Sequence, residues 1–365
     1  MMGRSMRKPV TVTRPFWQGV FPPDTLDYWA GLINPAWSLS RVRARVQSVT
    51  PASRDAVTVV LKPNRRFAGF VAGQHLAVHV TLDGVRHTRS YSPSRLPDAP
   101  ECLAITVQRV PGGRLSGYFC DQAAAGDLIE LGDAFGDMTT ATHARHTLLL
   151  AAGSGITPFI AQLRELALSP RSGQESLTLL YWVRDRASAC FTDELDALAR
   201  SLPGFRWQLR VTGDPADSAA ASRLSAADLA NWLGGRHAAS AAVLACGPAG
   251  FVSAAHGLSS ALGVTCLGEA FSPPAQGEAG EPVRVRLLRS GRELSIPAGQ
   301  ALLPALEAAG VKPAFGCRMG VCNTCACAMP EGVVENLLTG EVSQEPSSAL
   351  KLCVSAARSA LVLDC

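Results

Sequence analysis

Four cysteines near the carboxyl end of the chain have the spacing of a metal-cluster site. Cys317, Cys322 and Cys325 follow one another with four and then two residues between them, and Cys353 stands alone further along. This spacing is typical of a 2Fe-2S cluster, in which a short loop supplies three thiolates and a later segment supplies the fourth. Such a cluster carries one electron at a time, so the spacing predicts one-electron transfer.

A structural zinc site is the alternative interpretation of these cysteines. Zinc sites usually draw their ligands from two close pairs, and no second pair accompanies Cys353. The cluster is therefore favoured. Cys327 lies two residues beyond the third predicted ligand, and a plain buried thiol is its expected role.

Length and composition predict a multidomain protein of the reduced cytoplasm. The 365 residues exceed what one hydrophobic core usually organises, so two or three domains are expected. The net charge of +4 is small and no block of like charges occurs, which gives nucleic-acid binding little support. The eleven cysteines are clustered near one end or scattered singly and no signal peptide is recognisable, so we expect free thiols.

The most apolar stretch, residues 146–168, is predicted to be a strand, a loop and a helix. It is interrupted or charged at five positions, which are Gly153, Gly155, Pro158, Arg164 and Glu165. A membrane-spanning helix would need a longer uninterrupted apolar run.

Residues 39–142 have the pattern of a small antiparallel β-barrel. Short alternating runs rich in β-branched residues are separated by turn residues, and the clearest runs are 42–49, 56–61, 75–82 and 103–109.

The sequence pattern changes after residue 142. Residues 143–271 alternate predicted strands (147–152, 177–183, 206–211, 241–246) with predicted helices (156–168, 189–200, 226–233, 248–262). That alternation predicts a parallel sheet with helices on both faces.

Residues 272–281 are rich in proline, glycine and acid and have no periodicity, which marks an inter-domain linker. Residues 282–365, with the four cysteines, then form a separate domain.

Residues 1–38 form an N-terminal extension with basic residues and six aromatic residues. This extension either packs against the next domain or makes peripheral contact with a membrane surface, and packing is favoured because no long amphipathic helix is visible.

The tetrapeptide Arg89-Ser90-Tyr91-Ser92 ends a predicted barrel strand and is a candidate flavin site. An arginine can neutralise a pyrophosphate, a flat aromatic ring can cover one face of the isoalloxazine, and a small hydroxyl can lie near its reactive N5 edge. These residue types are common on strands, so the tetrapeptide is a weak signal when taken alone.

A glycine-rich turn further along could hold the same pyrophosphate. Gly112, Gly113 and Ser116 open a short helical stretch, whose free backbone amides and hydroxyl suit an anion. A hairpin turn with a helix cap is an equally good interpretation of this turn on its own.

Two strand-to-helix turns in residues 143–271 are candidate nucleotide-binding segments. In the first, Gly153, Ser154, Gly155 and Thr157 follow a buried strand, so the backbone can approach a phosphate at a helix N-terminus. The second turn follows the last predicted strand and consists of Cys246, Gly247 and Pro248. Its cysteine is either a buried inert thiol or a thiol beside the nicotinamide.

Taken in order, these segments resemble the ferredoxin-NADP reductase superfamily over about residues 40–365. The resemblance implies that the R-x-Y-S element (residues 89–92) binds FAD. It also implies that the turns at 153–158 and 246–248 bind the nicotinamide nucleotide. It also implies that Glu269-Ala-Phe271 closes the flavin face. The residues expected to be catalytic are then Tyr91, Ser92, Cys246 and Glu269.

With the cluster domain at its carboxyl end, the chain resembles the reductase components of multicomponent oxygenases and desaturases. That resemblance implies a third domain of the α+β β-grasp type, and electron transfer from NADPH through FAD to the 2Fe-2S cluster. The implied partner is a protein electron acceptor, either a metal-dependent oxygenase or a fatty acyl desaturase. We expect a monomer located in the cytoplasm.

NADPH is expected rather than NADH. Arg184 follows the second strand of the nucleotide domain, where an arginine can pair with a 2′-phosphate and where no acidic residue ends the strand to bind a 2′-hydroxyl. An exposed loop arginine is the alternative interpretation.

A stand-alone ferric or flavin reductase is a further alternative, but it would not need the cluster domain. Two other functions remain open at this point. One is an electron-transfer subunit of another flavoenzyme, although in the dihydroorotate dehydrogenase type the fourth cysteine follows the third more closely than it does here. The other is a redox sensor or scaffold protein with a structural metal site.

Overall fold

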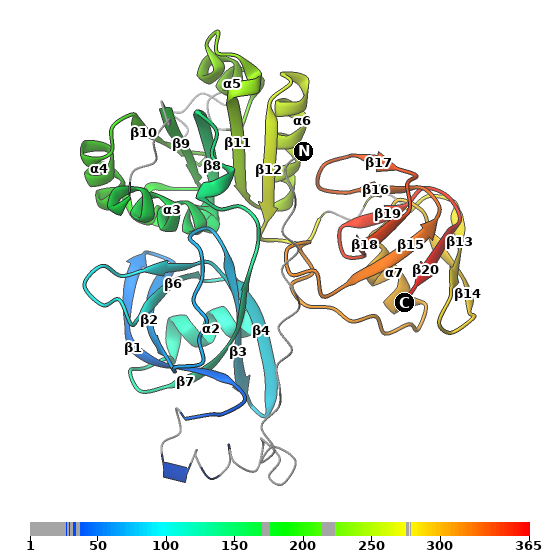
Figure 1. The fold of residues 1–365 in the computed structure, drawn as a ribbon, viewed down its shortest axis with the longest axis horizontal. Helices are drawn as coiled ribbons and strands as arrows, with labels where there is room; N and C mark the ends of the chain where they lie inside the picture. Colours follow the sequence, from blue (N-terminus) through cyan, green and yellow to red (C-terminus); the bar gives the residue numbers. More distant parts are fainter. Residues whose placement is uncertain are drawn as a thin grey trace, which may run out of the picture.

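The chain folds into three domains arranged as three lobes, which Figure 1 shows for this computed structural model. The structure describes Asp27, Trp29, Leu32 and Ile33, and then residues 37–169, 176–213, 223–274, 277 and 279–365. The prediction that residues 1–38 pack against the next domain falls largely outside the described residues.

The first domain is a seven-stranded antiparallel sheet that curls into a barrel (Figure 1). Its strands follow the order β4-β3-β7-β1-β2-β6-β5. They are β1 (Val42–Ser53), β2 (Ala56–Pro63), β3 (His75–Leu82), β4 (Val85–Tyr91), β5 (Pro93–Arg95), β6 (Leu103–Gln108) and β7 (Leu128–Phe135). One helix, α2 (Arg114–Asp121), packs against β2, β4 and β6. Alternate residues such as Val59, Leu61 and Leu76 fill the interior, as period-two alternation requires.

The second domain is a five-stranded parallel sheet in the order β10-β9-β8-β11-β12. The strands are β8 (His146–Ala152), β9 (Ser176–Val183), β10 (Phe205–Val211), β11 (Ala241–Gly247) and β12 (Thr265–Ala270). The helices are α3 (Ile156–Leu168), α4 (Thr192–Ser201), α5 (Ala226–Leu233) and α6 (Ala249–Ala261), with single 3-10 turns at 140–142, 153–155, 186–188 and 238–240.

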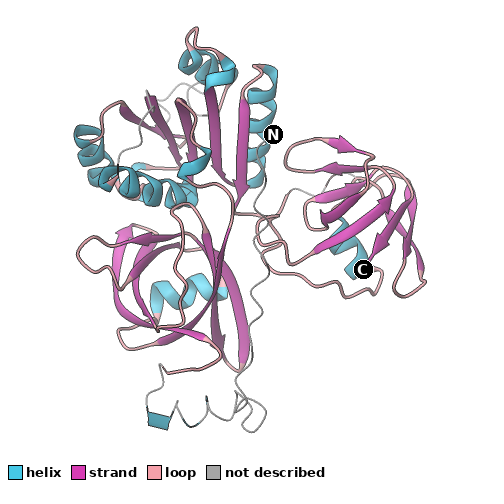
Figure 2. Ribbon diagram, in the orientation of Figure 1, coloured by secondary structure: helices cyan, strands magenta, loops and turns pink. Residues whose placement is uncertain are grey.

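Helices cover both faces of this parallel sheet (Figure 2). Leu149 and Ala151 of β8 point into one apolar cluster with α3 and α4, whereas Leu148 and Leu150 point into a second cluster with α5 and α6. A strand buried on both faces is expected to be continuously apolar, as β8 is. Residues 146–168 therefore form β8, a 3-10 turn and α3, as predicted. No helix in the described residues is long and apolar enough to cross a membrane.

The third domain combines a mixed sheet with one helix, which is the predicted α+β arrangement. The sheet order is β14-β13-β20-β15-β18, with a small sheet β17-β16-β19 beside it. The strands are β13 (Pro282–Leu287), β14 (Glu293–Pro297), β15 (Ala326–Glu331), β16 (Val334–Asn336), β17 (Val342–Ser343), β18 (Ser347–Lys351), β19 (Ser355–Ala357) and β20 (Leu361–Asp364). The helix is α7 (Leu302–Ala308), and its leucines are buried in the core of this domain.

Polar contacts fasten the barrel to the parallel-sheet domain. The Arg164 guanidinium on α3 donates to the Ser94 hydroxyl on β5 at 2.6 Å and also pairs with Glu194 on α4. On the opposite edge, Arg54 of the β1–β2 hairpin pairs with Asp185 at 2.7 Å. These contacts hold the two domains together on both sides of the region where their loops meet.

Candidate functional site

The two predicted nucleotide turns meet at the carboxyl edge of the parallel sheet. β8 and β11 are neighbours, and the chain leaves them toward opposite sides of the sheet, which makes this the topological switch point. Ligands of open parallel sheets bind at such points. Gly155 packs so tightly here that a side chain on it would collide with the carbonyl oxygen of Cys246. The glycine at 155 is therefore required by the close approach of the two turns.

A cleft of about 860 Å³ opens between the barrel and the parallel-sheet domain at this edge. That volume is within the usual range for a site that holds a cofactor-sized ligand. Six of the predicted residues line the cleft, namely Gly153, Ser154, Arg184, Gly247, Pro248 and Phe271. The remaining walls come from residues that the sequence did not single out, including Arg54, Gln108, Arg109, Trp182, Asp185, Arg223 and Phe251.

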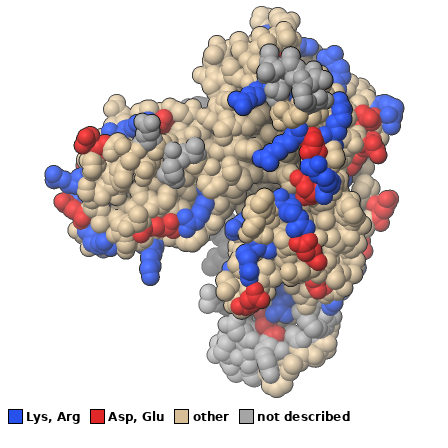
Figure 3. Space-filling model, turned by 180° about the vertical axis from the view of Figure 1, so that it is seen from behind, with Lys and Arg blue, Asp and Glu red and all other residues tan. Residues whose placement is uncertain are grey.

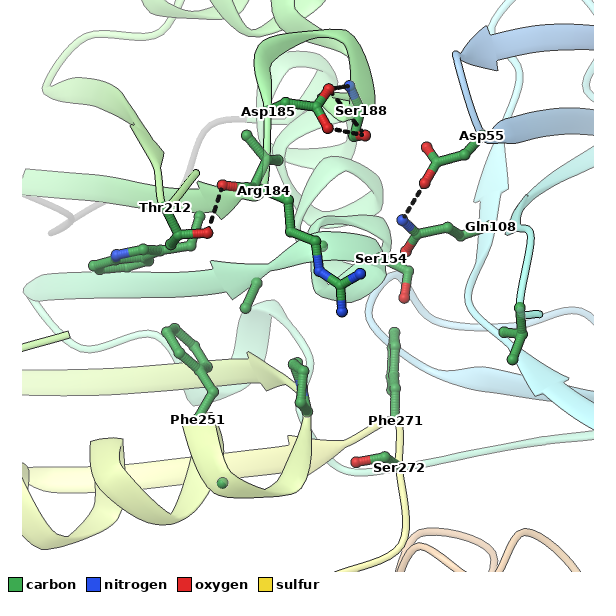
Figure 4. A pocket seen from close by; sticks show the side chains of 18 of the residues that line it. Asp55, Gln108, Ser154, Arg184, Asp185, Ser188, Thr212, Phe251, Phe271 and Ser272 are labelled. Atoms are coloured by element: carbon green, nitrogen blue, oxygen red, sulfur yellow. Dashed lines mark hydrogen bonds between the residues drawn. The ribbon is translucent and has the colours of Figure 1, made fainter. Parts of the chain in front are cut away.

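Positive charge lines this cleft. Figure 3 shows several Lys and Arg side chains, with Asp and Glu among them, on the back of the molecule where the two domains meet. Arg184 and Arg223 both line the cleft, and neither pairs with a carboxylate within the described part of the chain. Figure 4 shows the Arg184 side chain extending into the cleft toward Ser154. An anionic ligand would therefore find two arginines without carboxylate partners.

The acidic residue next to Arg184, Asp185, already has partners within the protein. Asp185 accepts a hydrogen bond from the Ser188 backbone amide at 3.1 Å and pairs with Arg54 at 2.7 Å. Hydrogen bonds and the Arg54 charge hold the pKa of Asp185 below its usual range, against the opposing effect of desolvation. The carboxylate is thus engaged by protein groups.

The candidate flavin residues lie at the end of β4 on the barrel. Tyr91 makes an edge-to-face contact with Phe119 of α2, with ring centroids 6.0 Å apart, and burial raises the pKa of its hydroxyl. Arg89 lies two residues earlier, on the same face of the strand, is exposed, and makes no carboxylate ion pair in the described ranges. Ser90 lies between them, half-buried and opposite Ala77 of β3.

The glycine turn at 112–113 begins α2 as predicted. Gly113 is the N-cap residue and no side chain caps the helix. The Ser116 hydroxyl accepts a hydrogen bond from the Val110 backbone amide at 3.1 Å and donates to the Gly113 carbonyl oxygen at 3.3 Å. Ser116 therefore closes the turn from inside and is buried, whereas the amides at the start of α2 have no side-chain cap.

A hydrogen-bonded row of three side chains joins the barrel to the parallel-sheet domain. The Ser92 hydroxyl and His75 Nδ1 are 3.0 Å apart, and His75 Nε2 contacts the Glu269 carboxylate on β12. His75 is 2% exposed and Glu269 11% exposed. The ring of Phe271 lies edge-on to His75 at 5.6 Å. The row thus connects two residues that were predicted to be catalytic through a histidine that was not predicted.

Three residues of the predicted nucleotide turns do not line the cleft, namely Gly155, Thr157 and Cys246. Cys246 is completely buried, and burial followed by the negative Glu269 raises the pKa of its thiol well above the usual range. Thr157 is 5% exposed, and its hydroxyl donates to the Ser154 carbonyl oxygen at 3.0 Å, which braces the turn between β8 and α3. Their predicted roles toward a bound nucleotide stay predictions.

The four predicted cluster ligands lie together as two pairs of thiols. Cys317 hydrogen-bonds with Cys322, and Cys325 with Cys353. These contacts lower the pKa of Cys322 and of Cys325. Among the described residues, no group of three or more ligand-type side chains is close enough together to hold a metal ion. Two pairs are the arrangement that suits two irons sharing four thiolates.

The loop around these cysteines fits a cluster in its backbone as well. Amides of Met319 and Cys322 point at Cys317 Sγ at 3.4 Å, and the amide of Gly320 points at Cys353 Sγ at 3.2 Å. A Cβ on Gly316 would lie 2.7 Å from Cys322 Sγ, so only glycine leaves room there. Amide donors aimed at sulfur are the interactions that tune cluster potentials.

The cluster loop lies on the side of the third domain that is nearest the other two. In Figure 1 the segment that precedes β15 extends toward the junction of the barrel and the parallel sheet. Cys325 and Cys353 are each 4% exposed, whereas Cys317 and Cys322 are half-buried at the surface of the loop. Cys317 and Cys322 are therefore the pair of cysteines nearer to solvent.

Comparison with known proteins gives the same three units in the same order. Residues 43–139 match the model of the oxidoreductase FAD-binding domain, residues 149–257 that of the oxidoreductase NAD-binding domain, and residues 285–358 that of the 2Fe-2S iron-sulfur cluster binding domain.

Individual proteins match over most of the chain. An NADPH oxidoreductase of Mycobacterium tuberculosis is 32% identical over 345 residues, which cover 93% of this chain and 88% of that protein. The heme-dependent oxidative N-demethylase beta subunit of Ectopseudomonas mendocina is 32% identical and covers 86% of this chain and 94% of that protein. The solved structure of phthalate dioxygenase reductase has a TM-score of 0.57 at 25% identity and covers 89% of this chain and 98% of that one.

The chain is an oxidoreductase with FAD-binding, NAD(P)-binding and 2Fe-2S domains. It belongs to the ferredoxin-NADP reductase superfamily, in the branch whose members carry a 2Fe-2S domain at the carboxyl end. Electron transfer from NAD(P)H through FAD to a 2Fe-2S cluster, and on to a protein acceptor, follows from this membership. The predicted fold class and cofactors are confirmed.

Proposed function

We propose that this chain is the NADPH-dependent reductase of a metal-dependent oxygenase or a fatty acyl desaturase. The observation that carries the proposal is the attachment of a one-electron carrier to a hydride-accepting unit in one chain. A low-potential iron-sulfur domain is superfluous for an acceptor that takes two electrons directly from flavin. Phthalate dioxygenase reductase and the N-demethylase subunit, named for oxidative systems, support the same assignment.

In this proposal the barrel holds FAD with Arg89 and the start of α2 on its pyrophosphate and Tyr91 against its ring. Arg89 is exposed and α2 has no side-chain cap, so both can serve an anion. When bound, the flavin accepts two electrons as a hydride and passes them on singly. Ser92 then lies near the reactive edge, and His75 and Glu269 keep its hydroxyl oriented.

The cleft takes the nicotinamide nucleotide, with NADPH preferred. Arg184 and Arg223 supply two positive charges to a 2′-phosphate. The carboxylate of Asp185, the acidic residue next to Arg184 in the cleft wall, already binds Arg54 and Ser188. NADH, which lacks the 2′-phosphate, would therefore bind to this wall of the cleft less tightly than NADPH.

The ligands assigned to the cluster are Cys317, Cys322, Cys325 and Cys353. The two thiol pairs and the amides directed at their sulfurs support this set. The cluster loop faces the other two domains, which suits electron entry from the flavin side.

A truncated chain that ends at residue 281 tests the output route. We expect it to reduce ferricyanide with NADPH as fast as the full chain, because FAD and nucleotide domains are retained. Reduction of cytochrome c, a one-electron protein acceptor, should fall at least about tenfold, since the one-electron carrier is gone. Equal cytochrome c reduction by both proteins, with equal support of the oxygenase or desaturase, would show that the cluster is not the output port.

A further inference from the structure

Two free thiols outside the cluster face each other across neighbouring strands of the third domain. β15 and β20 are antiparallel, and Ala328 pairs with Asp364. One step further along the same register places Cys327 directly opposite Cys365. Residues opposite each other in an antiparallel ladder point to the same face of the sheet, so the two sulfurs meet.

Both cysteines pack into the apolar core of the third domain, where their side chains interact with each other. The Cys327 thiol, which is 6% exposed, donates a hydrogen bond to the Ala328 carbonyl oxygen at 3.4 Å. Cys365 is less buried than Cys327. Cys365 is therefore the thiol of the pair that is easier to reach from solvent.

We propose that Cys327 and Cys365 are a redox-active pair that forms a reversible disulfide. Directly opposed residues of an antiparallel ladder have Cα atoms about 4.5 to 5.5 Å apart. A disulfide spans about 4.4 to 6.8 Å between Cα atoms, so the bond can form without moving the strands apart.

The oxidant of the pair is hydrogen peroxide. The thiol of Cys365, being the exposed one, attacks peroxide and becomes a sulfenic acid with release of one water. The Cys327 thiol then displaces the hydroxyl of that sulfenic acid, so the disulfide forms and a second water leaves. Two thiols lose two hydrogen atoms in total and one peroxide is reduced to two waters. A dithiol reductant restores the pair by exchange at the exposed sulfur.

The disulfide would act on the segment that completes the cluster. Thirty-seven residues separate the two cysteines, and Cys353 lies among them. Closing this loop restricts the opened states of the segment that supplies the fourth ligand. Oxidation of the pair should thus slow the loss of the cluster without altering its ligands.

The experiment uses the full-length holoprotein with its cluster intact. After treatment with a small excess of hydrogen peroxide and blocking of free thiols, trypsin separates Cys365 and Cys353 from Cys327, which stays in one peptide with Cys322 and Cys325. Cys365 is in peptide 359–365, Cys353 in peptide 352–358, and Cys327 in peptide 319–351. Mass spectrometry should detect peptide 359–365 joined to peptide 319–351, two hydrogen atoms lighter than their sum, while the visible absorbance of the cluster is unchanged.

Three variants identify which two cysteines form the disulfide. Cys327→Ala and Cys365→Ser should each abolish the joined peptide, whereas Cys102→Ser, which removes a half-buried thiol in the barrel, should leave it unchanged. In the wild type, the half-time of cluster loss to a chelator should lengthen after peroxide treatment. The proposal is overturned if the joined peptide is absent while other thiols are already oxidised, or if it persists in Cys327→Ala, which would mean that a cluster ligand had reacted.

Discussion

The cluster loop and the flavin–nicotinamide junction bring their reactive side chains together in different ways. Three of the four cluster cysteines lie within a nine-residue segment, and local backbone geometry places them. At the junction, His75 and Glu269 touch although 194 positions separate them in the chain. The first site lies within one domain and is built mainly from one loop, with Cys353 added from a later segment, whereas the second exists only when two domains are docked. The two should therefore fail independently.

Two of the four described non-glycine residues with a positive φ angle lie in the cluster loop. Arg318 and Asn323 have φ angles of 61° and 56°, in the left-handed region that side chains rarely adopt. Such positions cost about 1 kcal/mol or more each and persist when the surroundings over-determine them. Around Arg318 those surroundings are the Phe315 ring, 3.9 Å from the guanidinium, and a pair of contacts with Glu307. The strained turn is what directs amides toward the sulfurs.

The largest expected effect comes from removing one cluster ligand. Cys322→Ser replaces a thiolate with a weak ligand, so visible absorbance and the EPR signal of the cluster should disappear. Reduction of FAD by NADPH should continue at nearly the wild-type rate, because the junction is built from other domains. Cys327→Ser is the matched control two residues beyond Cys325, and it should keep a full cluster. A cluster that survives Cys322→Ser but is lost in Cys327→Ser would reverse the ligand assignment.

The next effect concerns the junction alone. His75→Ala leaves Ser92 and Glu269 without their shared partner, so the Ser92 hydroxyl, which we propose to lie near the flavin edge, loses its orientation. Misplacement of a reacting group by about 1 Å can cost about 100-fold, and we expect a loss of about that size in flavin reduction by NADPH, measured anaerobically by stopped flow. His75→Gln keeps a donor and an acceptor and should recover part of the rate. The cluster signal should be unchanged.

His79→Ala is the control for this substitution. His79 lies on the same strand and on the same outer face, and it hydrogen-bonds with Thr88 at 2.7 Å far from Glu269. It should behave as wild type. A similar loss in both variants would indicate damage to the barrel and would remove the reason for assigning His75 a role in the junction.

The sequence was informative where spacing or periodicity is local. The helices at 156–168 and 226–233 were predicted with the observed bounds, and the cluster cysteines follow a fixed spacing. α4 was predicted from residue 189 but begins at Thr192, because Phe191 just before it has a left-handed φ of 64°. β12 was not predicted, since its six residues include Gly268 and have no regular alternation.

His75 could not be found from the strand pattern. Along β3 the barrel core takes Leu76, Val78 and Val80, so alternation places His75 on the outer face, where a histidine looks like an ordinary polar residue. It is buried because the parallel-sheet domain covers it through Glu269 and Phe271. The burial comes from docking, which no local pattern records. The only local signal was a histidine directly after a Gly-Gln turn.

The smallest expected effect distinguishes the two nucleotides at the outer wall of the cleft. Arg184→Ala removes one of the two cleft arginines that have no carboxylate partner among the residues that the structure describes, so NADPH should lose affinity and NADH should not. One charge-assisted contact at a partly exposed site corresponds to about tenfold, and we expect KM for NADPH to rise by about that factor with kcat little changed. Arg206→Ala, an exposed arginine on β10 that does not line the cleft, is the matched control. Steady-state kinetics with both nucleotides decide the matter. Equal values of kcat/KM for NADPH and NADH in the wild type, unaltered in Arg184→Ala, would mean that the cleft does not recognise the 2′-phosphate. The proposed preference for NADPH would then be wrong. The assignments of the cluster ligands and of His75 would not be affected.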